Sequence, residues 1–341
     1  MDQVPLAFCE HLCDILSIDA VKLAGELSSY YGELAQNATE YRAMYCVAVR
    51  KGIQGYSYLQ YDRSNLEYRT VSGQVEDISK KYIRNVSIFL QDAENTNVSG
   101  ELVRRYPNAY FHFSIGSSSI NEAWVDLAYS LKRLGSVLLK KELDDEAFRL
   151  FQKLVEGWKL SSLITTGSAF QGNIVDMAKW LFLQDQFDVL EISNYDGQWN
   201  DAGGLKLASS VCELLDFWLQ NSERLKGKSL VVSRDCYGAV QQLEKFVRRG
   251  TATLCEKEES KFRDKEHSKI ANFKPLYVYR YEEGEESDKR KFYISFKCTQ
   301  HEKFYSKPTG TVQVAVNAES HVLGWLHCSC HCQKYLRLTF A

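Results

Sequence analysis

The chain has 341 residues, of which 45% are hydrophobic and 25% are charged, the composition of a globular protein long enough for two domains. Its formal net charge of −2 provides no broad basic field, so we expect neither nucleic acid nor an anionic membrane as a partner. No apolar run approaches the roughly 20 residues that span a bilayer, and the start lacks the basic region of a signal peptide. We therefore expect a cytoplasmic protein with free thiols.

Residues 1–42 are predicted to form a helical segment. Apolar residues recur there every three to four positions, which places them on one face of a helix. Pro5 stands where the first turn of a helix tolerates proline, and Asp19 can cap a second helix. The apolar face of the first helix comprises Val4, Phe8, Leu12, Ile15 and Leu16.

Residues 43–80 change to the two-residue period of strands. Tyr45, Val47 and Val49 alternate with less apolar residues, and a second alternating run includes Tyr56 and Tyr58. We expect a pair of antiparallel strands around Gly52–Gly55, forming a β hairpin connector.

Residues 81–250 carry a recurring apolar pattern. Its central positions are separated by 25, 26, 26 and 27 residues and are Val86, Phe111, Val137, Leu163 and Leu190. Leu230–Val232 is a further candidate, after 40 residues. A strand followed by a helix, repeated in this way, is typical of a leucine-rich-repeat-like solenoid, in which each unit covers the apolar face of the next. The alternative is an ordinary α/β domain with crossovers of similar length.

Helical periodicity is clearest in three segments between these strands. The first is capped by Asp144 and ends at Gly157, with Ala147, Phe148, Phe151, Leu154 and Val155 inward. The second carries Ile174, Val175, Ala178, Leu181 and Phe182, and the third carries Leu207, Val211, Leu214, Leu215 and Trp218.

Residues 251–341 combine a charged segment with strands. Residues 251–275 read as a solvated helix or loop with charges of both signs. Beyond them, alternation over 277–281, 292–296 and 312–316, and a final run over 322–340, predict an antiparallel meander. The fold class expected for the whole chain is α/β, with a helical N-terminus, a strand–helix solenoid and an antiparallel β C-terminal region.

The strongest candidate for a metal site is the run His327-Cys328-Ser329-Cys330-His331-Cys332. Cys and His are zinc ligands, but on a strand these neighbours point alternately to opposite faces. We favour a strand with small buried thiols over a metal site. Cys332 and Arg337 are separated by four residues, whereas a phosphatase nucleophile loop needs five, so that interpretation is rejected.

Two glycine-containing segments resemble parts of phosphate-binding sites. Gly227-Lys228-Ser229 precedes a strand and lacks the earlier glycine of a P-loop, so a tight turn explains it. Gly203-Gly204 is interpreted as a loop before a helix that begins near Leu205. No familiar set of catalytic residues occurs, and we expect no enzymatic activity, cofactor or metal.

The first thirty residues resemble a degenerate F-box. The resemblance rests on Val4-Pro5, Phe8, Leu12, Ile15-Leu16, Asp19, Val21, Leu23 and Leu27. It implies that Val4, Pro5, Phe8, Leu12, Ile15 and Leu16 bind a Skp1-like adaptor protein. The segment 28–31 stands where an F-box has small residues and often a Trp, which is missing here.

Residues 1–240 also resemble a nematode-expanded family of uncharacterised proteins with an F-box-like N-terminus and degenerate leucine-rich-like repeats. Matching phrases are Leu143-Asp144-Asp145-Glu146, Leu154-Val155-Glu156-Gly157 and Phe187-Asp188-Val189-Leu190. The two resemblances together imply a substrate-recognition adaptor of a cullin-type ubiquitin ligase, with an unknown protein substrate on the repeats. The alternative is a non-catalytic binding scaffold in which the N-terminal helices only cap the repeats.

Overall fold

The structure is a computed structural model that describes residues 4–16, 18–61, 82–92, 96–193, 201–233, 237–254, 277–284, 289–298 and 333–341. It is an α/β protein whose described strands form one mixed sheet, in the order β2-β1-β3-β4-β5-β6-β7-β8-β12-β11-β10-β9. The chain divides into two compact units; the first includes residues 1–136 and 145–151, and the second 137–144, 152–262 and 274–341.

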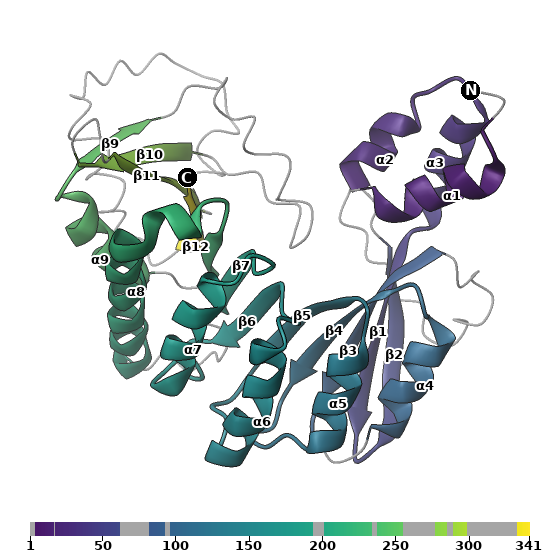
Figure 1. Cartoon of the computed structure of the whole chain (residues 1–341), viewed down its shortest axis with the longest axis horizontal. Helices are drawn as coiled ribbons and strands as arrows, with labels where there is room; N and C mark the ends of the chain where they lie inside the picture. The colour runs from purple at the N-terminus through teal and green to yellow at the C-terminus, as the bar shows by residue number, and fades with distance from the viewer. Residues whose placement is uncertain are drawn as a thin grey trace, which may run out of the picture. The chain divides into compact units, whose positions relative to one another are not determined.

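The described strands are β1 (Ala43–Arg50), β2 (Ile53–Tyr61), β3 (Ile83–Leu90), β4 (Tyr110–Ile115), β5 (Leu134–Leu139), β6 (Ser162–Thr166), β7 (Val189–Ser193), β8 (Ser229–Ser233), β9 (Thr251–Leu254), β10 (Tyr277–Glu283), β11 (Arg290–Cys298) and β12 (Gln333–Phe340). The described helices are α1 (Leu6–Ile15), α2 (Ile18–Ala24), α3 (Tyr30–Tyr41), α4 (Asn97–Arg105), α5 (Glu122–Ser130), α6 (Asp145–Glu156), α7 (Asn173–Phe182), α8 (Asp201–Asn221) and α9 (Tyr237–Val247), with a short 3-10 helix at Ser222–Leu225. Figure 1 shows their arrangement.

Helices α1, α2 and α3 share a small apolar core. Its buried members are Cys13, Val21, Ala24 and Ala35, with Leu16, Tyr31, Leu34 and Ala38 packed against them. The two predicted helices are present, but α2 begins at Ile18. Asp19 therefore lies in the first turn of α2 and not at the N-cap.

Strands β1 and β2 form the predicted antiparallel pair. Lys51 and Gly52 connect them with positive φ values of 50° and 69°, as a tight two-residue hairpin turn requires. On its other side β1 pairs in parallel with β3, through Tyr45 opposite Val86. The hairpin is therefore part of the main sheet and begins its parallel section.

The predicted repeat positions occupy equivalent places on neighbouring strands. Val86 lies opposite Phe111 on β4, and Leu190 on β7 lies opposite both Leu163 on β6 and Leu230 on β8. All five side chains are at most 2% exposed. The predicted alternation of strands and helices is confirmed, and its equivalent positions are buried opposite one another on β3 and β4 and on β6, β7 and β8.

The three predicted helices correspond to α6, α7 and α8. Every apolar residue predicted to face inward on α7 is buried, whereas on α6 Leu150 is buried and Phe148 only half-buried. The structure adds α4, α5 and α9. Helix α8 begins at Asp201, so Gly203-Gly204 lies inside it and the predicted loop before Leu205 is wrong.

The C-terminal strands are antiparallel, as predicted, and β12 lies between β8 and β11. Trp218 of α8 packs edge-on against Phe292 of β11, with ring centroids 4.9 Å apart, and stacks on Phe340 of β12 at 6.0 Å. Residues 251–254 of the predicted solvated segment form β9 instead. The alternating run over 312–316 and residues 322–332 lie outside the described residues.

One face of the sheet in the first unit is covered by helices. The ring of Phe113 on β4 meets Trp124 of α5 edge-on at 5.6 Å, and Tyr45 on β1 meets Tyr106, which follows α4, at 5.6 Å. Since side chains alternate along a strand, the neighbours of these core residues point the other way. We call that opposite side the polar face and define it by Asn85, Ser87, Tyr110, His112 and Ser136.

Candidate protein-binding surfaces

Apolar side chains at the start of α1 point away from the helical core. Val4, Leu6 and Phe8 are 41%, 46% and 52% exposed. Cys9 and Cys13, one turn apart on the same helix, are buried instead. Phe8 thus lies on a surface that is exposed in the described part of the chain, as a residue that binds a partner must be.

The structure separates the six residues predicted to bind a partner. Val4 and Pro5 are exposed at the start of α1, Phe8 is exposed on it, and Leu12 is half-buried. Leu16 turns inward and packs against the helical core. Ile15 ends α1, but its side chain is outside the described residues.

The inward face of α1 is formed by Cys9, Cys13 and Leu16, at spacings of four and three. Burial raises the pKa of the Cys13 thiol, and neighbouring Cys9 adds to the effect. A protonated thiol is a small apolar side chain and a poor metal ligand. The sequence prediction grouped Leu16 with the residues that bind a partner, whereas the structure places it with these two cysteines on the inward face.

A hydrogen-bonded cluster on the polar face joins three strands. Nδ1 of His112 on β4 lies 2.9 Å from Oγ of Ser136 on β5 and accepts the backbone N–H of Ser136 at 3.1 Å. Nε2 of His112 lies 3.2 Å from Oδ1 of Asn85 on β3. Because Nδ1 accepts, the proton is on Nε2 and is donated to Asn85.

Burial lowers the pKa of His112 to about 4, so the imidazole is neutral at pH 7. The order Ser–His–Asn resembles a nucleophile, a base and an orienting group. Yet a base with so low a pKa is poorly matched to proton transfer at neutral pH. We therefore interpret the cluster as a fixed polar patch and not as a catalytic centre. In the sequence, the cluster is indicated only by the alternation of His112 with Phe111 and Phe113, which places His112 on the opposite face of the strand.

Two arginines lie beside this cluster. The guanidinium of Arg133, just before β5, stands 5.5 Å from the ring centre of Tyr110 and donates to the carbonyl oxygen of Asn108 at 2.7 Å. Tyr110 is opposite Asn85 in the sheet, and Arg84 is the residue before Asn85. Burial lowers the pKa of Arg84, the positive charge of Arg133 lowers it further, and Cys13 acts in the opposite direction.

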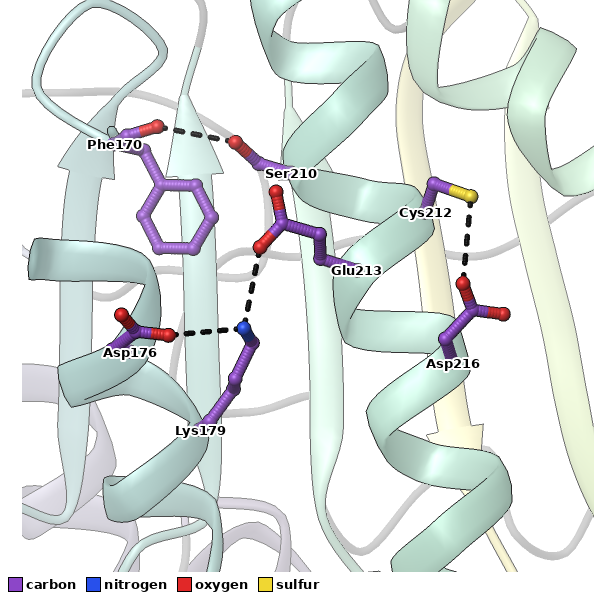
Figure 2. A network of polar contacts seen from close by, with 7 residues as sticks. All are labelled: Phe170, Asp176, Lys179, Ser210, Cys212, Glu213 and Asp216. Atoms are coloured by element: carbon purple, nitrogen blue, oxygen red, sulfur yellow. Dashed lines mark hydrogen bonds and ion pairs between the residues drawn. The ribbon is translucent and has the colours of Figure 1, made fainter. Parts of the chain in front are cut away.

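In the second unit, polar contacts connect α7 and α8 (Figure 2). Lys179 of α7 bridges Asp176 at 3.0 Å and Glu213 of α8 at 3.2 Å, and Oγ of Ser210 donates to the carbonyl of Phe170. Both carboxylates are at least half exposed, so these ion pairs contribute little to stability.

The thiol of Cys212 in the same network is not activated. Its Sγ lies 3.9 Å from Oδ2 of Asp216, whose Oδ1 accepts from Arg249 at 3.4 Å. Burial, followed by the charge of Asp216, raises the pKa of this thiol. The network therefore aligns two helices and offers no nucleophile.

Gly227-Lys228-Ser229 is a turn into β8, as the sequence predicted. Gly227 has a φ of 80°, and its N–H donates to the carbonyl of Phe340 at 2.9 Å. Nζ of Lys228 donates to the carbonyl oxygens of Gln184 and Phe187, the latter at 2.9 Å. The lysine is 6% exposed and closes the turn between α7 and β7, so it has a structural partner where a P-loop lysine would have phosphate.

The run His327–Cys332 lies outside the described residues. Across the described part of the chain, no three His, Cys, Asp or Glu side chains are grouped so that they could hold a metal ion. Among the described helices, none is both long and apolar enough to cross a membrane.

The chain was compared with protein-family models, with curated proteins and with solved structures. No protein-family model matches the chain, and neither a curated protein nor a solved structure is significantly similar to it. Two surfaces of the chain are candidates for binding a partner: the exposed apolar start of α1, and the polar face of β3, β4 and β5.

Proposed function

We propose that the chain is a substrate-recognition adaptor of a cullin-type ubiquitin ligase, which binds a Skp1-like protein through its N-terminal helices. The observation that carries the proposal is the exposure of Val4, Leu6 and Phe8 beside a helical core that is already complete without them. Apolar helix faces of this kind are normally covered in a complex. The F-box-like spacing of these helices supplies the class of partner.

The strand–helix part of the chain supports the other role of an adaptor, which is to bind the protein substrate. We interpret the strand–helix units from β3 to β8 as degenerate leucine-rich-like repeats, whose strands supply a surface for the protein substrate. The polar face has fixed side chains, since the hydrogen bonds of His112 hold Asn85 and Ser136 in place. Fixed side chains lose little entropy on binding, which suits recognition.

The test is a binding measurement by calorimetry between the purified full chain and a Skp1-like protein. Phe8→Asp places a charge at the centre of the apolar surface and should weaken binding at least about 30-fold, as loss of an aromatic anchor does. Ile53→Asp is the matched control, because Ile53 is 70% exposed on β2, beside the hairpin turn and outside the helical segment, and should leave binding unchanged.

Circular dichroism establishes that both variants are folded. If the wild-type chain does not bind the Skp1-like protein, or if Phe8→Asp binds as tightly as the wild type, the adaptor proposal fails. The N-terminal helices would then be a cap of a non-catalytic binding scaffold, the alternative that the sequence left open.

A further inference from the structure

The connections that lead into β4 and β5 are basic. Their basic side chains are Arg104 and Arg105 in the last turn of α4, and Lys132 and Arg133 between α5 and β5. Residues 102–121 and 127–136 contain no Asp or Glu. None of the four side chains forms an ion pair with a described residue, although Glu101 lies one turn earlier on α4. Their positive charges are therefore not neutralised by direct contact with a described carboxylate.

Hydrogen bonds join the two connections. The guanidinium of Arg133 donates to the carbonyl oxygen of Asn108 at 2.7 Å, and the backbone carbonyl of Arg133 accepts the N–H of Phe111 at 2.9 Å. Asn108 follows Arg105 by three residues, and β4 and β5 are neighbours in the sheet. The basic residues of both connections therefore lie near one another, beside the amino ends of adjacent strands.

Tyrosine rings lie among these charges. The guanidinium of Arg105 stands 5.4 Å from the ring centre of Tyr106, and that of Arg133 stands 5.5 Å from the ring centre of Tyr110. Tyr110, and Tyr129 near the end of α5, are each 46% exposed. Packing on a ring restricts a guanidinium before any ligand arrives, which lowers the entropic cost of binding.

We call this surface the basic end and define it by Arg104, Arg105, Tyr110, Tyr129, Lys132 and Arg133. We infer that the basic end binds single-stranded nucleic acid. Arg104, Arg105 and Lys132 pair with phosphates, while unpaired bases stack on the Arg133–Tyr110 pair and on Tyr129. The inference goes beyond the adaptor proposal and does not depend on it.

The net charge of the chain does not oppose this inference. The value of −2 is a sum over all 341 residues, and it excludes a broad basic field but not a local one. A site of four basic residues is small: specific binding to a duplex usually takes on the order of 6–10 phosphate contacts. Single strands need fewer contacts because base stacking contributes as well, at least about fivefold in affinity for each stacked base.

An acidic peptide is the other polyanion that could bind here. It would pair with the arginines but would make no use of the exposed rings of Tyr110 and Tyr129. Nucleic acid uses both, because its phosphates pair with arginine and its bases stack on aromatic rings and on guanidinium planes. The combination of unpaired arginines with exposed tyrosines therefore favours nucleic acid.

The test is fluorescence anisotropy with the full chain and a labelled oligouridylate of about ten nucleotides, within the usual site sizes for single strands. The comparison ligands are an abasic oligomer of the same length and charge, and a labelled peptide of alternating Glu and Ser. We expect the oligouridylate to bind at least about fivefold more tightly than the abasic oligomer, because only the former can stack. For three to four phosphate contacts, the logarithm of the binding constant should fall with the logarithm of the NaCl concentration with a slope of roughly −2 to −3.

The variants separate phosphate contacts from stacking. Arg105→Gln should weaken binding of the oligouridylate and of the abasic oligomer alike, by about fivefold, and should make the salt slope shallower by about 0.7. Tyr110→Ala should weaken the oligouridylate by about fivefold and leave the abasic oligomer within about twofold, whereas Tyr110→Phe should retain binding. Arg149→Gln is the matched control, because Arg149 lies on α6 of the same unit in an exposed ion pair with Glu146, so no loss is expected. Melting curves followed by circular dichroism show that each variant is folded.

Three results would overturn the inference: equal binding of the oligouridylate and the abasic oligomer, an equal loss in Arg149→Gln and Arg105→Gln, or tighter binding of the Glu peptide than of the oligouridylate. The last result would assign the basic end to an acidic protein partner. Phe8→Asp should bind the oligouridylate as the wild type does, since Phe8 lies on α1 and not at the basic end.

Discussion

The ring of His112 occupies the space that a side chain on Gly135 would need. A Cβ at that position would stand 2.7 Å from Nδ1 and 3.0 Å from Nε2 of the imidazole, closer than such atoms approach. The missing side chain on β5 is what allows the ring of β4 to reach Ser136, the next residue. The polar face therefore depends on the absence of a side chain at Gly135.

Gly135→Ala should destabilise the protein by about 1–3 kcal/mol, because the added methyl group forces His112 out of its hydrogen bonds. Urea unfolding measures the change in the free energy of unfolding. Gly100→Ala on α4 is the control: a Cβ there meets nothing within 4 Å, so the helix should gain up to about 1 kcal/mol. Equal effects of the two substitutions would show that the ring does not fill this space.

His112 should make stability fall as the pH is lowered from 6.5 to 4. Its pKa in the folded state, about 4, is below the value of 6.5 expected when unfolded, so within this range only the unfolded chain takes up the proton. The stabilisation from the neutral ring is complete above pH 6.5 and is lost progressively toward pH 4, in all roughly 3 kcal/mol.

The measurement compares urea unfolding of the wild type and His112→Gln across that pH range. Every other titrating group is common to the two proteins, so the difference between their unfolding free energies isolates this imidazole. The difference should shrink as the pH falls. A difference that stays constant from pH 7 to pH 4.5 would contradict the lowered pKa.

Lys228→Met should cost about 2–3 kcal/mol of unfolding free energy. The substitution keeps the apolar stem but leaves the buried carbonyl oxygens of Gln184 and Phe187 without their donor. Lys226→Met removes an exposed ion pair with Glu223 and should cost less than about 0.5 kcal/mol. If the two variants lose the same unfolding free energy, the hydrogen bonds of the Lys228 ammonium group do not stabilise this turn.

Leu163→Ala should destabilise the second unit by about 2–5 kcal/mol, because the side chain is fully buried in the row shared by neighbouring strands. Leu23→Ala removes the same atoms from a side chain that is 65% exposed on α2, and should change stability by less than about 0.5 kcal/mol. Chemical unfolding of both variants would test whether the repeat positions form the core. A small loss at Leu163 would contradict that assignment.

Some features of the fold could be predicted because their signals are local. The spacing of Val86, Phe111, Val137, Leu163 and Leu190 identified five strands, and helical periodicity identified α6, α7 and α8. Gly203-Gly204 misled the prediction, because glycine disfavours a helix by only about 1 kcal/mol and the rest of α8 outweighs it. The candidate surface at α1 could be predicted in part: Val4, Pro5 and Phe8 are exposed, whereas Leu12 is half-buried and Leu16 packs inward.

By itself, the sequence determined that the chain alternates strands with helices and which side chains of most of these elements are buried. Both follow from periods of two and about 3.6 residues, which are properties of neighbouring positions. Only the tertiary structure decided that β12 lies between β8 and β11, that β1 pairs in parallel with β3, and that Arg133, His112 and Asn85 meet on one face. These relationships join residues far apart in the chain, and they depend on strand register and packing, which no local pattern of amino acids encodes.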